Sequence, residues 1–182
     1  METFISVDIE TSGPIPGKFS LLCIGACLVD NESVTFEQFV KPTTQIFDPE
    51  ALEVIGLSLE DVDQKGLTAS AAMALFRDWV ESVAKGSSPV FVGFNASFDW
   101  AFVNYYFHQY VGANPFGFAA LDIKSMFFGK YEVSWADTRS SRIAANLNIQ
   151  QVTAHNALED ALYQAKLFRM IRELSAGECH AK

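Results

Sequence analysis

The sequence predicts a single α/β domain built on a mixed five-stranded sheet that is flanked by helices. The first observation is that residues 1–40 hold three apolar segments joined by short turns, which is typical of an antiparallel meander. The second is that later apolar segments alternate with helical patterns, which is typical of parallel strands. The third is a length of 182 residues with 49% hydrophobic and 19% charged residues, which suits one domain with a substantial core.

The first three strands come from the meander. The first strand is expected to end in the stretch VDIETSG at residues 7–13, because the residues before and within it fit a buried, pleated surface. The apolar residues of this strand are Phe4, Ile5, Val7 and Ile9. The second and third strands are expected at residues 19–29 and 34–40. The first strand is predicted to lie centrally, with its carboxyl end at the edge where such sheets hold their sites.

Capping signals place several of the helices. Asp48-Pro49 predicts a helix start, with an acidic cap before a proline, and this helix ends near Gly56. The other elements are expected to be a helix from 68 or 70 to 83, a strand at 90–94, a helix at 97–111, a strand at 118–123, short helices at 125–128 and 140–147, and a last helix at 156–174. One domain is therefore expected at residues 1–174, with a short tail at 175–182.

The bulk composition limits the classes of function. A formal net charge of −9 argues against a protein that coats long nucleic acid through a basic surface, although a small site can still meet phosphate through bound metal. The sequence has neither an apolar run of membrane-spanning length nor a secretory signal pattern, so no membrane partner is expected. Three cysteines without metal-binding spacing fit a reducing compartment, and the cytoplasm is the expected location.

Asp8 and Glu10 form the first candidate site. Residues two apart in a strand point to the same face, so the two carboxylates are expected side by side. Two anions held this close repel each other and lose hydration, and no Lys or Arg follows until Lys18. A divalent cation such as Mg²⁺ or Mn²⁺ would compensate the charge. The alternative is that both are turn residues leading into residues 11–14.

A third carboxylate, Asp99, lies just inside the helix expected at 97–111. It heads a row of residues at helical spacing that continues as Phe102, Val103, Tyr106 and Tyr110. A carboxylate that leads an apolar row points inward and needs a partner. The alternative is an acid near a helix start that is favoured only by the helix dipole.

The stretch HNALEDA at residues 155–161 carries the last candidates. Asn156 and Glu159 have the spacing of a capping box, so the last helix is expected to begin at Asn156. Asp160 then falls on the apolar face of the first turn, while His155 lies outside the helix and is free to converge with it. Taken alone, His155 is better explained as a surface histidine or a hydrogen-bonded core histidine.

Three stretches together resemble the motifs of the DEDDh family of 3′–5′ exonucleases, whose relatives include oligoribonuclease and the proofreading subunit of bacterial DNA polymerase III. They are VDIETSG (7–13), FNASFDWAFV (94–103) and HNALEDA (155–161), which follow the family's order within residues 4–168. Each motif is weak alone, whereas the ordered set is specific. The resemblance implies a ribonuclease H-like fold and a metal-dependent phosphodiester hydrolase.

Residue roles follow from the same resemblance. Asp8, Glu10, Asp99 and Asp160 are implied to bind two divalent ions, Mg²⁺ or Mn²⁺, and His155 is implied to be the general base. All five residues are then catalytic. The histidine places the chain apart from the branch of the superfamily that has tyrosine at this position. The implied product is a nucleoside 5′-monophosphate released from a 3′ end.

The substrate contacts are less well defined. The substrate-binding candidates are Thr11, Ser12, Ile15, Phe98, Arg139 and Arg142. Many relatives have a leucine wedge where this chain has Pro14, so either Ile15 replaces it or the contact differs. Ile55-Gly56 stands where the proofreading type has His-Gly. For Arg139 and Arg142, a solvated pair on a loop is an equally good interpretation of the sequence.

The expected substrate is single-stranded DNA or RNA with a free 3′ end, with short oligomers and RNA slightly favoured. Two other classes of function remain open. One is a ribonuclease H-like endonuclease or integrase, although the projecting histidine argues against it. The other is a non-catalytic interaction subunit, although such modules tend to lose a ligand and all five candidate residues are present here. Homodimer formation is also left open by the sequence.

Overall fold

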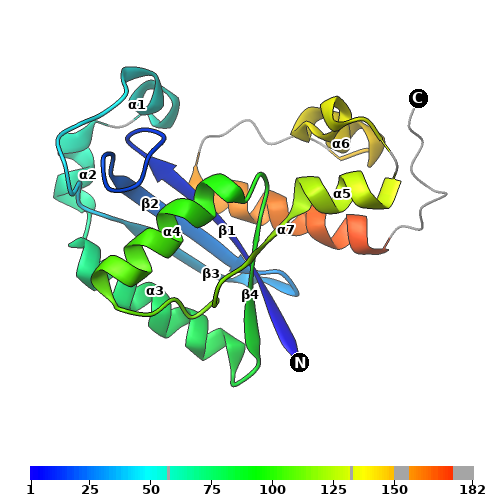
Figure 1. Ribbon diagram of the computed structural model, residues 1–182, viewed down its shortest axis with the longest axis horizontal. Helices are drawn as coiled ribbons and strands as arrows, with labels where there is room; N and C mark the ends of the chain where they lie inside the picture. The colour runs from blue at the N-terminus through cyan, green and yellow to red at the C-terminus, as the bar shows by residue number, and fades with distance from the viewer. Residues whose placement is uncertain (57, 132, 150–155, 174–182) are drawn as a thin grey trace.

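Five strands form one mixed sheet in a computed structural model that describes residues 1–56, 58–131, 133–149 and 156–173 (Figure 1). The strands are β1 (Glu2–Thr11), β2 (Leu21–Leu28), β3 (Asn31–Phe39), β4 (Ser88–Gly93) and β5 (Ala120–Asp122). Their order in the sheet is β3-β2-β1-β4-β5. β1 is antiparallel to β2 and parallel to β4. The predicted meander, the later parallel strands and the central position of the first strand are therefore confirmed.

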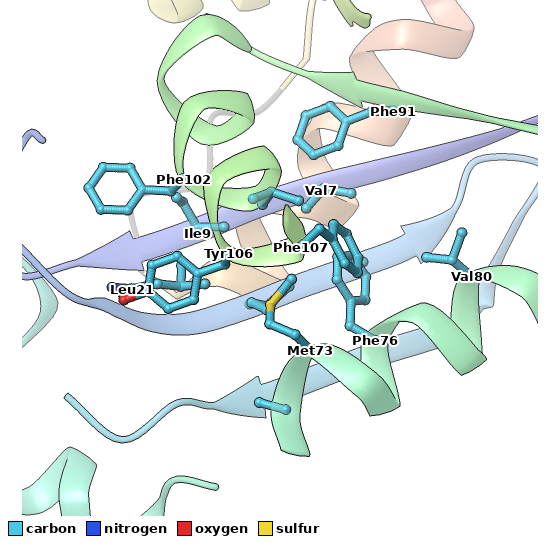
Figure 2. Close-up of a cluster of buried hydrophobic side chains, with 14 of the residues drawn as sticks. Val7, Ile9, Leu21, Met73, Phe76, Val80, Phe91, Phe102, Tyr106 and Phe107 are labelled. Carbon is cyan, nitrogen blue, oxygen red and sulfur yellow. Dashed lines mark hydrogen bonds between the residues drawn. The ribbon is translucent and has the colours of Figure 1, made fainter. Parts of the chain in front are cut away.

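Helices cover both faces of this sheet. They are α1 (Pro49–Ile55), α2 (Leu59–Lys65), α3 (Ala69–Ala84), α4 (Ser97–Tyr110), α5 (Ile123–Tyr131), the 3₁₀ helix η1 (Trp135–Thr138), α6 (Ser140–Asn146) and α7 (Ala157–Glu173). On one face, α3 and α4 bury an aromatic-rich core that includes Phe76, Phe102 and Tyr106 against β1 and β2 (Figure 2). On the other face, α5, α6 and α7 bury a second core around Phe127 and Phe168.

Capping explains both a confirmed helix and a helix that the periodicity does not indicate. As predicted, Asp48 caps α1 by accepting a hydrogen bond from the Glu50 amide, and Gly56 ends that helix in the left-handed conformation. Helix α2 is not among the helices expected from the sequence. It has a capping box formed by Ser58 and Asp61, but its seven residues bury only Val62, so no apolar stripe reveals it.

The region after α4 also differs from expectation. β5 has three residues instead of the six predicted, and Phe118 outside it is 95% exposed. Asp122 accepts a hydrogen bond from the Ser125 amide at 2.9 Å, which starts α5 at Ile123, two residues earlier than predicted. Because Ile123 and Tyr131 also pack in the core, α5 continues beyond the predicted end at residue 128.

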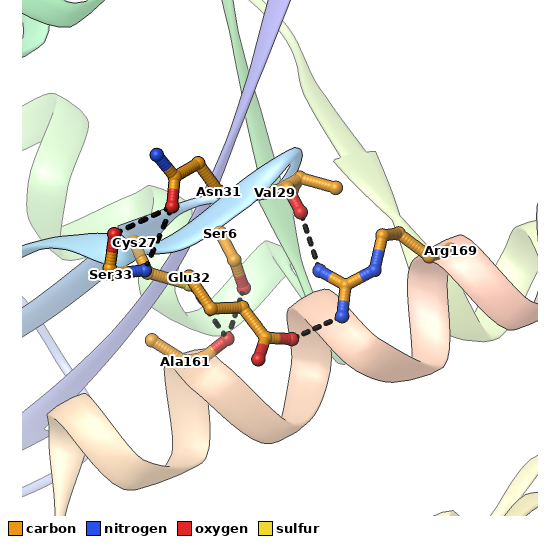
Figure 3. Close-up of polar contacts among 8 residues, drawn as sticks. All are labelled: Ser6, Cys27, Val29, Asn31, Glu32, Ser33, Ala161 and Arg169. Carbon is orange, nitrogen blue, oxygen red and sulfur yellow. Dashed lines mark hydrogen bonds and ion pairs between the residues drawn. The ribbon is translucent and has the colours of Figure 1, made fainter.

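Helix α7 lies unusually close to the sheet at its N-terminal end. A Cβ atom on Gly25 of β2 would lie only 2.1 Å from the carbonyl carbon of Ala157, so glycine is required for this approach. One turn later the Ala161 carbonyl accepts hydrogen bonds from Ser6 Oγ at 2.7 Å and Cys27 Sγ at 3.6 Å. Figure 3 shows these contacts. These contacts therefore fix how closely α7 approaches the sheet and where it lies along its own axis.

The far end of the same helix is fastened by Arg169. Its guanidinium donates to the Val29 carbonyl and pairs with Glu32, beyond the end of β2 (Figure 3). Among the described helices, none is both long and apolar enough to cross a membrane.

Candidate active site

Three carboxylates meet at the carboxyl end of β1. Asp8 and Glu10 project from one face of the strand, and Asp160 projects from the first turn of α7 on the same face. One ligand oxygen of each residue lies within 4.8 Å of the others. The Asn156 side chain accepts hydrogen bonds from the Leu158 and Glu159 amides at 3.0 Å, as expected for the cap of this helix.

Asp99 approaches this cluster from α4, which packs on the opposite face of the sheet. Its side chain is only 5% exposed, and it accepts a hydrogen bond from the Ile9 backbone. The row of residues that it heads is buried as predicted at Phe102, Val103 and Tyr106. Asp99 is thus an inward-facing carboxylate between two elements of the core, not merely an exposed acid at a helix start.

Burial and mutual repulsion raise the pKa values of three carboxylates at this site, those of Asp8, Glu10 and Asp99. Burial raises the pKa of Asp8 well above its usual range, and the anions of Asp99, Asp160 and Glu10 raise it further. Burial and the neighbouring Asp160 raise the pKa of Glu10 to about 7. The pKa of Asp99 is raised to about 8, mainly by burial, although backbone hydrogen bonds to its carboxylate oppose this.

Hard oxygen ligands that carry negative charge fit divalent cations. A cation between β1 and α7 would favour the charged forms of Asp8 and Glu10, because it would offset both the repulsion and the loss of hydration. The donor set contains only oxygen, which favours Mg²⁺ or Mn²⁺ over softer metals. The site can therefore hold divalent ions.

Two polar residues near the carboxylates are not among the predicted ones. Gln164 is 95% buried, donates from Nε2 to Asp8 Oδ1 at 2.5 Å and accepts from the Phe94 amide at 2.9 Å. Asp122 at the end of β5 accepts from the Ala96 amide at 3.0 Å, and its charge adds to the rise in the pKa of Asp99. Asp122 has a signal in the sequence, an acid at the end of a predicted parallel strand, whereas Gln164 has none.

A cavity of about 380 Å³ lies beside the cluster, between the end of β1 and α1. Glu10 forms part of its wall, and of the substrate-binding candidates Thr11 and Phe98 line it. The other lining residues are Ile9, Gly13, Pro14, Asp48, Glu50, Ala51, Val54 and Ile55. The cavity thus joins the carboxylates to a largely apolar wall that suits a nucleobase.

The remaining candidates lie elsewhere. Ile15 is 52% exposed and does not line the cavity, where Pro14 lies instead. Ser12 Oγ donates to the Ile46 carbonyl at 3.0 Å and accepts from the Ser20 amide at 2.8 Å, so it holds the loop together. Arg139 and Arg142 are exposed at the start of α6. His155 lies outside the described residues.

Comparisons with known proteins agree with this geometry. The exonuclease family of the RNase T type matches residues 5–168. An Escherichia coli protein named 3′–5′ DNA exonuclease Cap18 is 56% identical over 175 residues, which are 96% of this chain and 94% of that protein.

Two solved structures share the fold. The crystal structure of E. coli exonuclease I in complex with a dT13 oligonucleotide matches with a TM-score of 0.75 at 18% identity. The match covers 95% of this chain but only 41% of exonuclease I, so the chain spans less than half of that protein. The nuclease domain of 3′hExo, a DEDDh family member bound to rAMP, matches with a TM-score of 0.77 at 16% identity, covering 96% of this chain and 94% of that domain. The expected ribonuclease H-like fold is confirmed.

Proposed function

The chain belongs to the exonuclease family and is a 3′–5′ exonuclease, and from this premise we propose that it degrades single-stranded DNA from a free 3′ end and releases nucleoside 5′-monophosphates. The observation that carries the proposal is the cluster of Asp8, Glu10 and Asp160 beside a cavity large enough for a terminal nucleoside. The carboxylates suit the scissile phosphate, and the cavity suits the nucleoside on its 3′ side.

Asp8, Glu10, Asp99 and Asp160 are the proposed ligands of two divalent ions. Ions held by these residues would supply charge stabilisation to a phosphodiester and would make an attacking water more acidic. The four carboxylates come from β1, which lies in the sheet, and from α4 and α7, which pack on its opposite faces. His155, as general base, takes the proton of the attacking water, because the ordinary pKa of histidine lies near neutrality.

The terminal nucleoside is proposed to enter the cavity, with its base against Phe98 and Val54. Thr11, which lines the cavity, is the proposed contact to the sugar. Arg139 and Arg142 are proposed to meet phosphates of the rest of the strand. The name of the 56% identical relative leads us to propose DNA in place of the RNA that the sequence slightly favours.

The first test measures degradation of a 5′-labelled single-stranded DNA with Mg²⁺ or Mn²⁺. We expect a ladder that shortens from the 3′ end, a block by a 3′-phosphate, and complete loss with chelator. Asp8→Ala should lower the rate at least about a hundredfold, because it removes a ligand shared by the site. Asp63→Ala, which removes an exposed acid on α2, is the matched control and should leave the rate unchanged.

Two results would contradict the proposal. Wild-type activity in Asp8→Ala would exclude Asp8 as an essential metal ligand. Efficient cutting of a circular single strand would show that the protein is an endonuclease. A matched RNA strand degraded faster than the DNA would overturn the substrate assignment alone.

His155→Ala should be roughly 10²–10⁴-fold slower while Mn²⁺ still binds. An unchanged rate in that variant would exclude His155 as the base.

A further inference from the structure

Two large aromatic side chains are exposed together on α5 and η1. Phe128 is 45% exposed and Trp135 is 54% exposed. Their ring centroids are 5.8 Å apart and the rings meet edge to face at 79°. Lys124 Nζ lies 4.5 Å from the centroid of the Trp135 ring, so a cation accompanies the pair. Trp135 is also the exposed one of the three tryptophans, since Trp79 and Trp100 are partly buried against the core.

Folding alone does not require this arrangement. The inner face of α5 packs in the core through three residues that recur at every fourth position, Ile123, Phe127 and Tyr131. Lys124 and Phe128 recur at the same spacing on the outer face, where a polar residue would serve the helix equally well. Phe128 therefore exposes apolar surface to solvent in the free protein, which points to a ligand.

Trp135 is held rigidly next to it. The buried Thr138 donates from Oγ1 to the Trp135 carbonyl at 2.7 Å, and Ser134 and Asp137 close the same turn by a backbone hydrogen bond at 3.0 Å. These hydrogen bonds hold the backbone of Trp135 in a short helix, and the indole packs edge to face against Phe128. A preorganised ring loses little conformational entropy when a flat ligand stacks on it.

The pair lies on the opposite side of the carboxylates from the cavity. α5 begins where β5 ends, and β5 is separated from β1 by β4, a lateral distance of about 10 Å. Asp122 ties this start to α4, because it caps α5 and also accepts from the Ala96 amide. α1, which walls the cavity, contacts β1 on the other side, as Figure 1 shows. A strand whose 3′ end fills the cavity thus continues past the carboxylates toward α5 and η1.

Local charge favours an anionic strand here. The segment 124–142 holds four of the thirteen Lys and Arg residues and only two of the twenty-two acids. It is therefore net positive in a chain whose formal net charge is −9. The chain outside this segment is net negative, so this segment offers a favourable path for a nucleic acid that leaves the carboxylates.

We propose that Phe128 and Trp135, with Lys124, form a stacking platform for a base of single-stranded DNA upstream of the cleaved nucleotide. The platform rests on the proposed function and deepens it. Aromatic rings stack on any base, so the platform adds affinity for strand length without adding sequence preference. The Lys124 ammonium is placed to meet the phosphate of the stacked nucleotide.

The test compares Trp135→Ala and Phe128→Ala with Phe118→Ala, which removes an exposed ring outside the platform. The KM and kcat of each variant are measured on a longer single strand and on a dinucleotide. The two platform variants should raise KM for the longer strand about five- to a hundredfold, with kcat and dinucleotide cleavage unchanged. Phe118→Ala should match the wild type on both substrates. An unchanged KM in Trp135→Ala, or equal losses on both substrates, would overturn the platform.

A second measurement does not depend on cleavage. Tryptophan fluorescence is titrated with a single-stranded oligothymidine in the Asp8→Ala background without metal. Stacking on Trp135 should quench the emission, and Trp135→Phe should abolish the quenching while affinity for the strand is retained. Binding without quenching would refute the platform even if DNA cleavage is confirmed. Quenching without cleavage by the wild-type enzyme would leave the platform standing and refute the proposed function.

Discussion

At the scale of single residues, the environment of Asp8 is set by one neutral donor among several anions. A backbone amide can only donate, so the Phe94 amide fixes the carbonyl of the Gln164 side chain toward β4. The amide group of Gln164 then has to face Asp8, to which it donates at 2.5 Å. This hydrogen bond lowers the pKa of Asp8 against the combined effect of burial and three carboxylates. Gln164 therefore fixes the orientation of the Asp8 carboxylate, a proposed metal ligand.

Gln164→Met should preserve most of the packing and lose the orientation of Asp8. We expect Mn²⁺ affinity and kcat/KM to fall about ten- to a hundredfold, because partners that orient a metal ligand contribute on that scale. Electron paramagnetic resonance of free Mn²⁺ measures the affinity directly. Gln38→Met, which removes an amide that donates to the Phe39 carbonyl on β3, is the control. A lower melting temperature with unchanged Mn²⁺ affinity would assign Gln164 a structural role only.

Sequence reasoning reaches the carboxylates and stops before Gln164 for a physical reason. Alternation in a strand and the spacing of a helix dictate where Asp8, Glu10 and Asp160 point, so their meeting is predictable. The sequence does not show where the side chain of a glutamine on a helix points, because its amide group is equally stable when it is hydrated by water. Only the distance to Asp8 and the Phe94 amide reveals its role.

At the scale of elements, the position of the site depends on how closely α7 approaches β2. Gly25 is paired with Asp8 in the sheet, and a Cβ there would also lie 2.2 Å from the Leu158 nitrogen. Backbone atoms cannot rotate away as a side chain can. Any larger residue at this position therefore lifts the first turn of α7, which carries Asp160, away from β1.

Gly25→Ala should reduce activity and stability together. We expect a loss of roughly 1–3 kcal/mol in the free energy of unfolding, since overpacking a rigid contact has this cost, and a fall in kcat through displacement of Asp160. Gly129→Ala in α5 is the matched control, because its Cβ would meet nothing within 4 Å and alanine favours a helix. Urea unfolding and the exonuclease assay measure both effects. A Gly25→Ala protein as stable and as active as the wild type would contradict the close approach.

Element boundaries were predictable where local chemistry sets them. The cap at Asp48 and the glycine at position 56 bound α1 as expected, because these signals act within a few residues. α2 and the short β5 depend on what surrounds them. α2 buries one residue, and β5 ends where Asp122 starts a helix, so apolar patterning alone cannot define either.

At the scale of the whole molecule, the site lies where the two layers of helices meet at one edge of the sheet. α7 brings Asp160 from one layer and α4 brings Asp99 from the other, while β1 between them contributes Asp8 and Glu10. The cores on both faces must be formed before these groups converge. Overall stability is thereby linked to the charge at the site.

The metal-free protein should become less stable as the pH rises from about 4 to 8. Folding raises the pKa of Glu10 from 4.5 to about 7 and that of Asp99 from 3.8 to about 8, so in this window the folded state holds protons that the unfolded state releases. The free energy of unfolding therefore falls with pH, on the order of 3 kcal/mol from Glu10 alone. Melting temperatures in chelator at pH 5 and pH 8 measure this fall, and Mn²⁺ should remove it. A metal-free protein that melts higher at pH 8 would contradict the raised pKa values.

The docking of α7 also has a consequence for the cell that makes the protein. Asp8 lies in β1, whereas its partner Gln164 follows 156 positions later and leaves the ribosome after it. Until α7 has been translated and has settled against Gly25, the growing chain carries Asp8 and Glu10 without Asp160. The carboxylate cluster is therefore complete only after α7 has been synthesised, and a translation product that ends before α7 lacks Asp160.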